Sequence, residues 1–288
     1  MSVQVYTNQS TMPAPSEAVY AWHDRPGAFE RLGPPWQPMR VVRAPVGIAD
    51  GVEAEFRIQV APLVWLTWLA RHEGGVPGVS FRDVQIRGPF ASWVHTHRFD
   101  PVDGTTSRLV DQIEYALPLG ALGRLVGGHS TTQRLAQVFG YRHRVTARDL
   151  SLHAPFEGTP PMKILVTGAT GLIGSALTSF LTTGGHDVVR LTRSPSRPTD
   201  IGWSPESGTL DASALEGFDA VVHLAGENVG EGRWSDAKKQ RILQSRTLGT
   251  KLLCDTLAGL RDRPKVLVSA SAVGIYGDRG DEALDEHS

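Results

Sequence analysis

Three glycines spaced three residues apart carry the clearest chemical signal in the sequence. Gly168, Gly171 and Gly174 follow the apolar run from Lys163 to Thr167 and precede an amphipathic stretch. Glycines after a buried strand let the backbone turn and approach a pyrophosphate. The free N–H groups at the start of a helix near Leu172 would bind the negatively charged phosphates. The spacing is G-x-x-G-x-x-G, a variant of the dinucleotide fingerprint. The segment predicts a dinucleotide site, and the alternative is a glycine-rich turn without a ligand.

An arginine follows the next expected strand, residues 186–192. Enzymes that use NAD usually place Asp or Glu at this point to bond the ribose 2′-hydroxyl. This chain instead has Thr192-Arg193-Ser194, and a guanidinium suits a 2′-phosphate. We therefore expect NADP as cofactor more than NAD, with Arg193 as the contact; the alternative is a solvated arginine at a strand end. Arg190 and Arg197 are weaker candidates.

Further apolar strands are expected at residues 218–224 and 266–269. Between them, Ser235 is expected to cap a long helix that runs through Ile242, Leu253 and Leu257.

Composition and length describe an ordinary globular chain. The 288 residues are 40% hydrophobic with a net charge of −1, which fits two domains that each bury a core. No dense basic stripe indicates a nucleic-acid surface, and no apolar run is long enough for a membrane span. The N-terminus lacks a signal-peptide pattern, so a cytoplasmic location is expected. The single cysteine, Cys254, lies among leucines and is expected to pack.

The segment 153–161 is rich in Pro and Gly and is expected to link a domain of residues 1–152 to one of residues 162–288. Upstream, Val3 to Gln9 alternates as a strand, and Ser16 looks like the cap of a helix through Trp22, with a short helix to Leu32. Strands are then expected at residues 39–43, 52–60, 64–71, 79–87, 92–99 and 108–117, before a long helix over residues 119–150. This order predicts a curved antiparallel sheet wrapped on a helix.

Two histidines in the sixth of these strands have the residue type for ligand binding. Alternation places Trp93, His95, His97 and Phe99 on one face, which is the buried face if the aromatic residues are buried. Histidines two residues apart are able to hold a metal or a polar ligand head. No third ligand is evident, so the favoured interpretation is partly buried histidines bonded to neighbours, with no metal. Trp65 and Trp68 fall on opposite faces, so at most one of them lines a cavity.

The element order of residues 3–152, with Pro15-Ser-Glu-Ala-Val-Tyr-Ala-Trp22 after the first strand, resembles the START-like (SRPBCC) superfamily, which includes polyketide cyclases and carrier domains. The resemblance implies an α+β helix-grip fold. It also implies a cavity between the sheet and the terminal helix that accepts an apolar molecule.

After residue 162 several separate motifs agree. They are Thr167-Gly-Ala-Thr-Gly-Leu-Ile-Gly174, Leu224-Ala-Gly-Glu-Asn228, Arg233-Trp234 with Lys238 and Ser245-Arg246, Gly249-Thr250, and Ser269-Ala-Ser-Ala-Val-Gly-Ile-Tyr-Gly277. Together they resemble the extended short-chain dehydrogenase/reductase superfamily, in the atypical YfcH-like part of its NAD-dependent epimerase/dehydratase branch. The resemblance implies an α/β Rossmann fold, a doubly wound parallel sheet. It also implies cofactor contacts from Gly168, Thr170, Gly171, Leu172, Ile173, Gly174, Arg193, Leu224, Ala225, Gly226 and Ser269.

The resemblance implies one catalytic residue. Ser271 matches the strand-end serine that polarises a substrate carbonyl or hydroxyl, and the alternative is a small residue needed for packing. Hydride transfer in this superfamily normally uses a tyrosine with a lysine four residues later. Here Tyr276 is followed by Gly280, so no Tyr-x-x-x-Lys pair exists, and Tyr276 is expected in a wall or turn.

The chain ends at Ser288, where a full-length relative continues into its substrate-binding lobe, so we expect the parallel sheet to be C-terminally incomplete, with one uncovered edge. The leading functional hypothesis is an NAD(P)-dependent oxidoreductase or epimerase that acts on a small molecule when full length, fused to an apolar-ligand-binding domain. The alternatives are a non-catalytic NADP(H)-responsive binding protein, and a lipid or polyketide carrier or cyclase acting through the N-terminal domain. The oligomeric state is left open.

Overall fold

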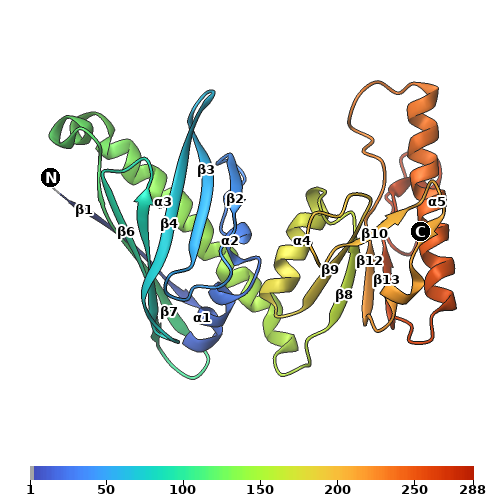
Figure 1. Cartoon of the computed structure of the whole chain (residues 1–288), viewed down its shortest axis with the longest axis horizontal. Helices are drawn as coiled ribbons and strands as arrows, with labels where there is room; N and C mark the ends of the chain where they lie inside the picture. Colours follow the sequence, from blue (N-terminus) through green and yellow to red (C-terminus); the bar gives the residue numbers. More distant parts are fainter. Residues whose placement is uncertain (1–2) are drawn as a thin grey trace. The chain divides into compact units, whose positions relative to one another are not determined.

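The computed structural model describes residues 3–288, apart from the side chains of residues 121–124, 126 and 273. Contacts divide the chain into two compact units, one of Met1–Pro160 with Ser179–Gly185 and one of Pro161–Thr178 with His186–Ser288. Each unit has its own sheet (Figure 1).

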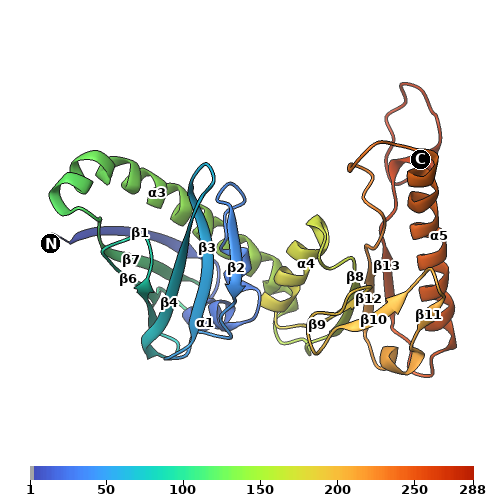
Figure 2. The same cartoon turned by 45° about the horizontal axis from the view of Figure 1, so that its top comes forward.

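The first unit is built on a seven-stranded antiparallel sheet in the order β1-β7-β6-β5-β4-β3-β2 (Figure 2). Its strands are β1 (Gln4–Met12), β2 (Met39–Arg43), β3 (Glu53–Ala61), β4 (Val64–Val76), β5 (Ser80–Arg87), β6 (Ser92–Pro101) and β7 (Ser107–Ala116). The sequence places every one of these strands, but it ends β4 at Arg71. Gly74, at φ +60°, forms an irregularity in the pairing with β5 that lets the strand continue.

Three helices complete the first unit: α1 (Ser16–Asp24), α2 (Ala28–Arg31) and α3 (Gly120–His153), with a 3-10 turn η1 (Ala154–Phe156) after them. Leu135 and Phe139 of α3 pack against Trp93, Ile113 and Tyr115 of the sheet, so the long helix lies on the face that β6 and β7 bury. The predicted sheet with a long helix is therefore confirmed. The predicted cap is wrong, because Ser16 is the first helical residue, follows Pro15 and bonds only Glu17.

The second unit contains a six-stranded sheet in the order β11-β10-β9-β8-β12-β13. Its elements are β8 (Lys163–Thr167), α4 (Leu172–Thr183), β9 (Asp187–Thr192), β10 (Ile201–Ser204), β11 (Thr209–Leu210), η2 (Ala212–Leu215), β12 (Ala220–His223), α5 (Asp236–Gly259), β13 (Val266–Ser269) and η3 (Val273–Tyr276). The five strands from β10 to β13 along this order are parallel, and β11 pairs antiparallel with β10. Ser235 caps α5 as predicted, accepting a hydrogen bond from Lys238 N–H.

The sequence analysis missed β10, β11 and η2. These strands have only four and two residues, and Gly208 at φ +69° turns one into the other. Trp203 of β10 is nevertheless buried with Leu253 and Leu257 of α5, so the short strand supplies much of this core. Gly249 of α5 lies beside this ring, and a Cβ there would be in ordinary contact with it at 3.5 Å.

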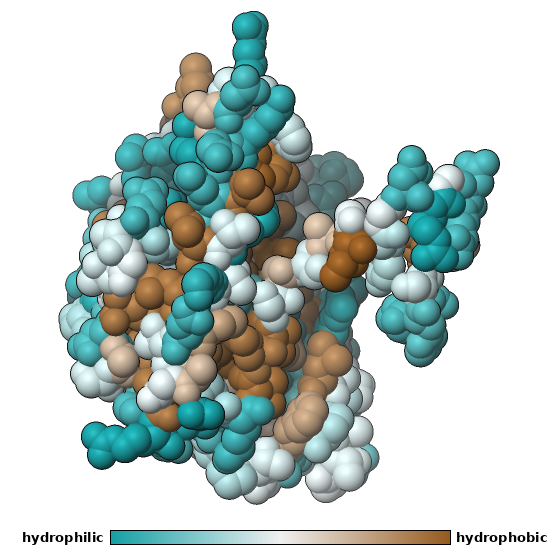
Figure 3. Space-filling view, turned by 90° about the vertical axis from the view of Figure 1, so that its right-hand side faces the viewer, coloured by the Kyte–Doolittle hydropathy of each residue, from teal (hydrophilic) through white to brown (hydrophobic). Residues whose placement is uncertain are grey.

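One edge of the second sheet carries exposed apolar side chains, as the sequence predicted. Val266, Leu267 and Val268 of β13 are between 42% and 54% exposed. Figure 3 shows apolar side chains gathered at the surface on this side of the molecule. Among the described residues, no helix has the length and apolar character needed to cross a bilayer.

Candidate functional site

Four parallel strands of the second unit end at the same level. Thr167 of β8 is in register with Leu191 of β9 and His223 of β12, and His223 is in register with Ser269 of β13. The segments that follow these residues therefore leave from one edge of the sheet. The chain proceeds from β8 to β9 on one side of β8 and later to β12 on the other, so the direction of winding reverses between β8 and β12. Parallel sheets bind ligands at the carboxyl edge, at such a reversal.

The glycine loop between β8 and α4 packs closely against its neighbours at this edge because two of its glycines have no side chain. Gly168 has φ +67°, and a Cβ there would lie 2.7 Å from the carbonyl carbon of Leu224. Gly174 is buried, and a Cβ there would lie 2.2 Å from Gly168 O and 2.8 Å from Ala169 Cα. Gly168 is thus needed for contact with the loop after β12, and Gly174 for contact of α4 with its own loop.

The first turn of α4 faces outward. A turn closed by Gly171 N–H and Gly168 O, at 3.0 Å, leads directly into the helix. Leu172 is 93% exposed and Ile173 is 68% exposed, whereas Gly174 is buried. A free helix N-terminus beside a glycine turn presents backbone N–H groups and a positive dipole end to an anion.

A buried hydrogen-bond chain joins β8, β12 and α5 beneath this loop. Thr167 Oγ1 accepts hydrogen bonds from Leu224 N–H (3.1 Å) and Ala225 N–H (3.0 Å), which occupies both of its lone pairs. Its own proton is therefore donated to His223 Nδ1 at 2.8 Å, and His223 Nε2–H donates to Thr250 Oγ1 at 3.0 Å. Burial lowers the pKa of His223 and so favours the neutral ring, which this series of hydrogen bonds requires. The sequence analysis quoted Thr167 and Thr250 within motifs but gave no role to either of them or to His223.

The loop after β12 is held by α5. The Lys238 ammonium donates a hydrogen bond to Glu227 Oε1 at 2.8 Å, and the backbone N–H of Glu227 donates to Ser245 Oγ at 2.9 Å. Arg246 donates to Glu227 O, and its guanidinium lies so close to Gly226 that a Cβ there would meet it at 3.1 Å. The hydrogen bond and charge of Lys238 lower the pKa of Glu227. These contacts place Leu224, Ala225 and Gly226 against the glycine loop.

Two arginines near the end of β9 differ in how many hydrogen bonds they make within the protein. Arg190 forms two hydrogen bonds with Asp200, at 2.7 and 2.5 Å, and a third with Ser196. Arg193 is exposed just beyond the carboxyl end of β9, and its charge is a minor cause of the lowered pKa of Glu227. Arg190 is thus occupied inside the protein, while Arg193 is open to a ligand.

The residues after β13 lie at the same edge. Ser269 ends the strand, and the next residue, Ala270, donates its N–H to His223 O at 2.9 Å. Ser271 is exposed two residues beyond the strand, and Tyr276 is half-buried in η3. The register therefore brings the segment of Ser269 and Ser271 beside β12, as their expected roles require. No contact of either hydroxyl with the glycine loop is seen within residues 3–288.

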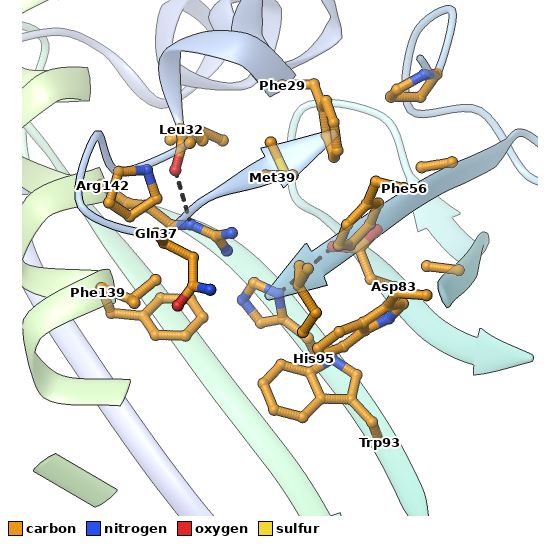
Figure 4. A pocket seen from close by; sticks show the side chains of 18 of the residues that line it. Phe29, Leu32, Gln37, Met39, Phe56, Asp83, Trp93, His95, Phe139 and Arg142 are labelled. Carbon is orange, nitrogen blue, oxygen red and sulfur yellow. Dashed lines mark hydrogen bonds and ion pairs between the residues drawn. The ribbon is translucent and has the colours of Figure 1, made fainter. Parts of the chain in front are cut away.

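The first unit contains a cavity of about 440 Å³ with mostly apolar walls (Figure 4). Phe29, Phe56, Trp68, Trp93 and Phe139 contribute aromatic side chains. Trp68 lines the cavity and Trp65 does not, and both His95 and His97 reach it, so the predicted facing of these strands is confirmed. On the opposite wall, Arg142 of α3 donates from Nε to Leu32 O at 3.2 Å. Burial lowers the pKa of Arg142, and the negative charges of Asp111 and Asp83 oppose that shift.

A histidine–aspartate cluster forms one end of this cavity. His95 and His97 lie between two carboxylates: His95 Nε2 is 3.1 Å from Asp111 Oδ1, and His97 Nε2 is 3.1 Å from Asp83 Oδ2. Burial raises the pKa of Asp111, but the charge of His97 and hydrogen bonds from His143 and both neighbouring histidines hold it well below its usual value. Burial lowers the pKa of His97, but the charge and hydrogen bond of Asp111, aided by Asp83, raise it to about 9. The sequence analysis did not identify either aspartate.

This cluster predicts a loss of stability at high pH. The folded state raises the pKa of His97 from its usual 6.5 to about 9, so its contribution is complete below pH 6.5 and disappears as pH rises through 9. In a buffer with a chelator, hydrogen–deuterium exchange of the β6 and β7 amides should accelerate between neutral pH and about pH 10 beyond the intrinsic effect of pH. The His97→Gln variant should lack this additional acceleration. Equal behaviour of the two proteins would contradict the assignment of a charged His97.

Residues 164–288 match the NAD dependent epimerase/dehydratase family. They form an epimerase-family domain. An epimerase family protein from Mycobacterium bovis is 42% identical over 125 residues, which are 43% of this chain and 41% of that protein. The epimerase family protein SDR39U1 from Homo sapiens is 36% identical over 129 residues, which are 44% of this chain and 42% of that protein.

One solved structure is similar over both units. The nucleoside-diphosphate sugar epimerase from Corynebacterium glutamicum aligns with a TM-score of 0.78 and 33% identity, over 98% of this chain and 58% of that one. The chain thus spans less than two thirds of each of these three relatives. The epimerase-family domain of this chain contains all the motifs that the sequence analysis quoted after residue 162.

Proposed function

We propose that the epimerase-family domain binds a nicotinamide dinucleotide across the carboxyl edge of β8, β9 and β12. The observation that carries the proposal is the contact of Gly168 with Leu224 and Ala225, where a Cβ has no room. The parallel strand order β10-β9-β8-β12-β13 corresponds to 3-2-1-4-5, the order of a Rossmann sheet. The pyrophosphate is cradled by the turn of Gly168 to Gly171 and by the exposed first turn of α4.

The cofactor that best suits the domain is NADP. Arg193 is exposed beyond β9 with no carboxylate in the adjacent positions Thr192 and Ser194. Arg190 is unavailable because Asp200 and Ser196 engage it. A guanidinium forms paired hydrogen bonds with a phosphate, so Arg193 recognises the adenosine 2′-phosphate that NAD lacks.

The activity proposed for the complete protein is that of an oxidoreductase or epimerase on a small molecule. A bound nicotinamide would supply the hydride donor or acceptor. Ser271 would donate a hydrogen bond to the substrate carbonyl or hydroxyl oxygen from its position after β13. The neutral His223, held between Thr167 and Thr250, would orient the loop that borders the cofactor and would not exchange protons itself.

A second candidate is a protein that senses NADP(H) without turnover. It is favoured by one observation: Tyr276, the only tyrosine after residue 162, is followed by Gly280 where a catalytic lysine would stand. In both cases the cavity of the first unit would hold an apolar molecule with a polar or anionic end, since aromatic walls face Arg142. This molecule would be the substrate in the first case and a separate ligand in the second.

The test of cofactor choice is a titration of the chain with NADPH and NADH, followed by nicotinamide fluorescence. The Arg193→Ala variant should bind NADPH about 10-fold to 100-fold more weakly, the effect of losing a charge-assisted phosphate contact of ~1.5–3 kcal/mol, and NADH almost unchanged. Arg261→Ala, which removes an exposed arginine that follows α5 and was not a candidate for the phosphate contact, is the matched control. Equal weakening for both cofactors would contradict the phosphate role. NADPH oxidation with a panel of aldehydes, ketones and quinones separates the enzyme from the sensor.

A further inference from the structure

Three potential metal ligands meet at the end of the cavity in the first unit. Asp83 of β5 is in register with His95 of β6, and His97 lies two residues along the same strand on the same face. Each of the three offers one ligand atom, and these atoms all lie within 4.8 Å of one another. All three side chains line the cavity, and both histidines are buried (Figure 4 labels Asp83 and His95).

The two ring nitrogens of His95 face two different carboxylates. Its Nε2 lies 3.1 Å from Asp111 Oδ1 and donates to it. Its Nδ1 lies 3.4 Å from Asp83 Oδ2, and in the neutral ring, where Nε2 holds the single N–H, this Nδ1 presents a lone pair to the carboxylate. Two lone pairs at this distance repel each other unless positive charge lies between them.

His97 has the same arrangement. Its Nδ1 lies 2.8 Å from Asp111 Oδ1, and its Nε2 lies 3.1 Å from Asp83 Oδ2. The charged ring carries an N–H on both nitrogens, and removal of the Nε2 proton leaves a lone pair that faces Asp83, as the metal-bound form requires. Asp83 Oδ2 is therefore approached by a nitrogen from each of two histidines, and the other nitrogen of each ring lies close to Asp111.

The outer partners hold these groups in place. His72 Nε2 donates to the other oxygen of Asp83 at 2.8 Å, and His143 Nε2 donates to Asp111 Oδ2 at 2.7 Å. Histidines that bind metals usually donate their second N–H to a carboxylate, as His95 Nε2 does to Asp111, and His97 Nδ1 lies 2.8 Å from the same carboxylate. His72 Nδ1 is buried and has no hydrogen-bond partner among the described side chains, so a further acceptor is available beside the cluster.

We propose that Asp83 Oδ2, His95 Nδ1 and His97 Nε2 bind a divalent transition metal ion, with zinc as the best fit. Metal–ligand bonds of 2.0–2.1 Å in a tetrahedral site place ligand atoms about 3.3 Å apart. The distances from Asp83 Oδ2 to the two nitrogens, 3.4 and 3.1 Å, agree with this spacing. With both histidine rings neutral, the two positive charges of the ion balance Asp83 and Asp111, a role that protons on the histidines must otherwise fill.

Three protein ligands leave a fourth position, and it is open to the cavity because all three ligands line it. Sites of this kind accept water or a substrate oxygen. The ligand class for the cavity is therefore an apolar molecule with a carbonyl, hydroxyl or carboxylate oxygen that reaches the metal. This inference concerns the first unit and does not depend on nicotinamide binding by the epimerase-family domain.

The test uses the untagged full chain, stripped of metal with a chelator and titrated with Co²⁺. We expect one equivalent to bind, with the visible absorption of low-coordinate cobalt, and Zn²⁺ to displace it. The Asp83→Asn and His95→Gln variants should bind Co²⁺ roughly 100-fold more weakly or not at all, an effect at the upper end of that seen for outer partners. His23→Gln is the control, because His23 lines the same cavity but bonds Val19 O.

Circular dichroism establishes that each variant is folded, and a metal-induced rise in melting temperature, present in the native chain and the control, should be absent in the ligand variants. If a ligand variant does not fold, the native chain still decides the matter. Failure of the stripped native chain to bind Co²⁺ or Zn²⁺ overturns the proposal, because the cluster is then balanced by protons alone. Unchanged binding in His95→Gln also overturns it.

Discussion

The Gly174→Ala variant should lose at least about 100-fold in affinity for NADPH, corresponding to about 3 kcal/mol. Its Cβ would lie 2.2 Å from Gly168 O and 2.8 Å from Ala169 Cα, and both are backbone atoms that a rotamer change cannot move aside. Either α4 or the glycine loop must shift. A shift displaces the N–H groups that the pyrophosphate requires. Isothermal titration calorimetry with NADPH measures the loss.

Gly259→Ala is the matched control for this substitution. Gly259 is the last residue of α5, and no heavy atom lies within 4 Å of a Cβ built there. This variant should bind NADPH like the native chain. If Gly174→Ala also retained native affinity while remaining folded, the loop between β8 and α4 would not be the pyrophosphate site.

The Asp111→Asn variant should destabilise the first unit by about 3–5 kcal/mol, the cost of breaking a buried charged network from one side. Three histidine nitrogens lie within 3.1 Å of this carboxylate, whose side chain is 3% exposed. An amide accepts through only one oxygen, and its NH2 group would face a ring N–H. Hydrogen–deuterium exchange of the β6 and β7 amides reports this effect without a contribution from the epimerase-family domain.

Asp100→Asn is the corresponding control on the same strand as His95 and His97. Asp100 pairs with Arg98 at 2.8 Å, but both side chains are exposed, and such pairs contribute about 0–1 kcal/mol. The protection of the β6 and β7 amides from hydrogen–deuterium exchange in this variant should resemble that in the native chain. A similar loss in both variants would mean that the buried network adds nothing beyond an exposed ion pair.

The sequence predicted most elements because their patterns are local. The strands Met39–Arg43 and Val266–Ser269 have the predicted bounds, since each is a short apolar or alternating run between turn residues. Ser235 was identified as a cap because its side chain acts on the first turn of its own helix. The same local reasoning failed at Ser16, where the preceding Pro15 already occupies the cap position.

The polar clusters could not be predicted in this way because they depend on pairing between distant segments. Asp83 meets His95 only through the register of β5 with β6, and Asp111 meets His143 of α3 only when the helix packs on the sheet. The sequence analysis found no third metal ligand near His95 and His97 because Asp83 is twelve residues away from His95 along the chain. A useful signal was present nonetheless: an aspartate at an inward position of an alternating strand requires a buried partner.

The glycine-loop account is tested most directly by hydrogen–deuterium exchange of the native chain with and without saturating NADPH. We predict slower exchange in residues 168–174 and 224–226, because these two segments border the pyrophosphate. We predict no change in the strands of the first unit. Unchanged exchange in both segments at a concentration where calorimetry detects binding, or no heat of binding with either NADPH or NADH, would contradict the account.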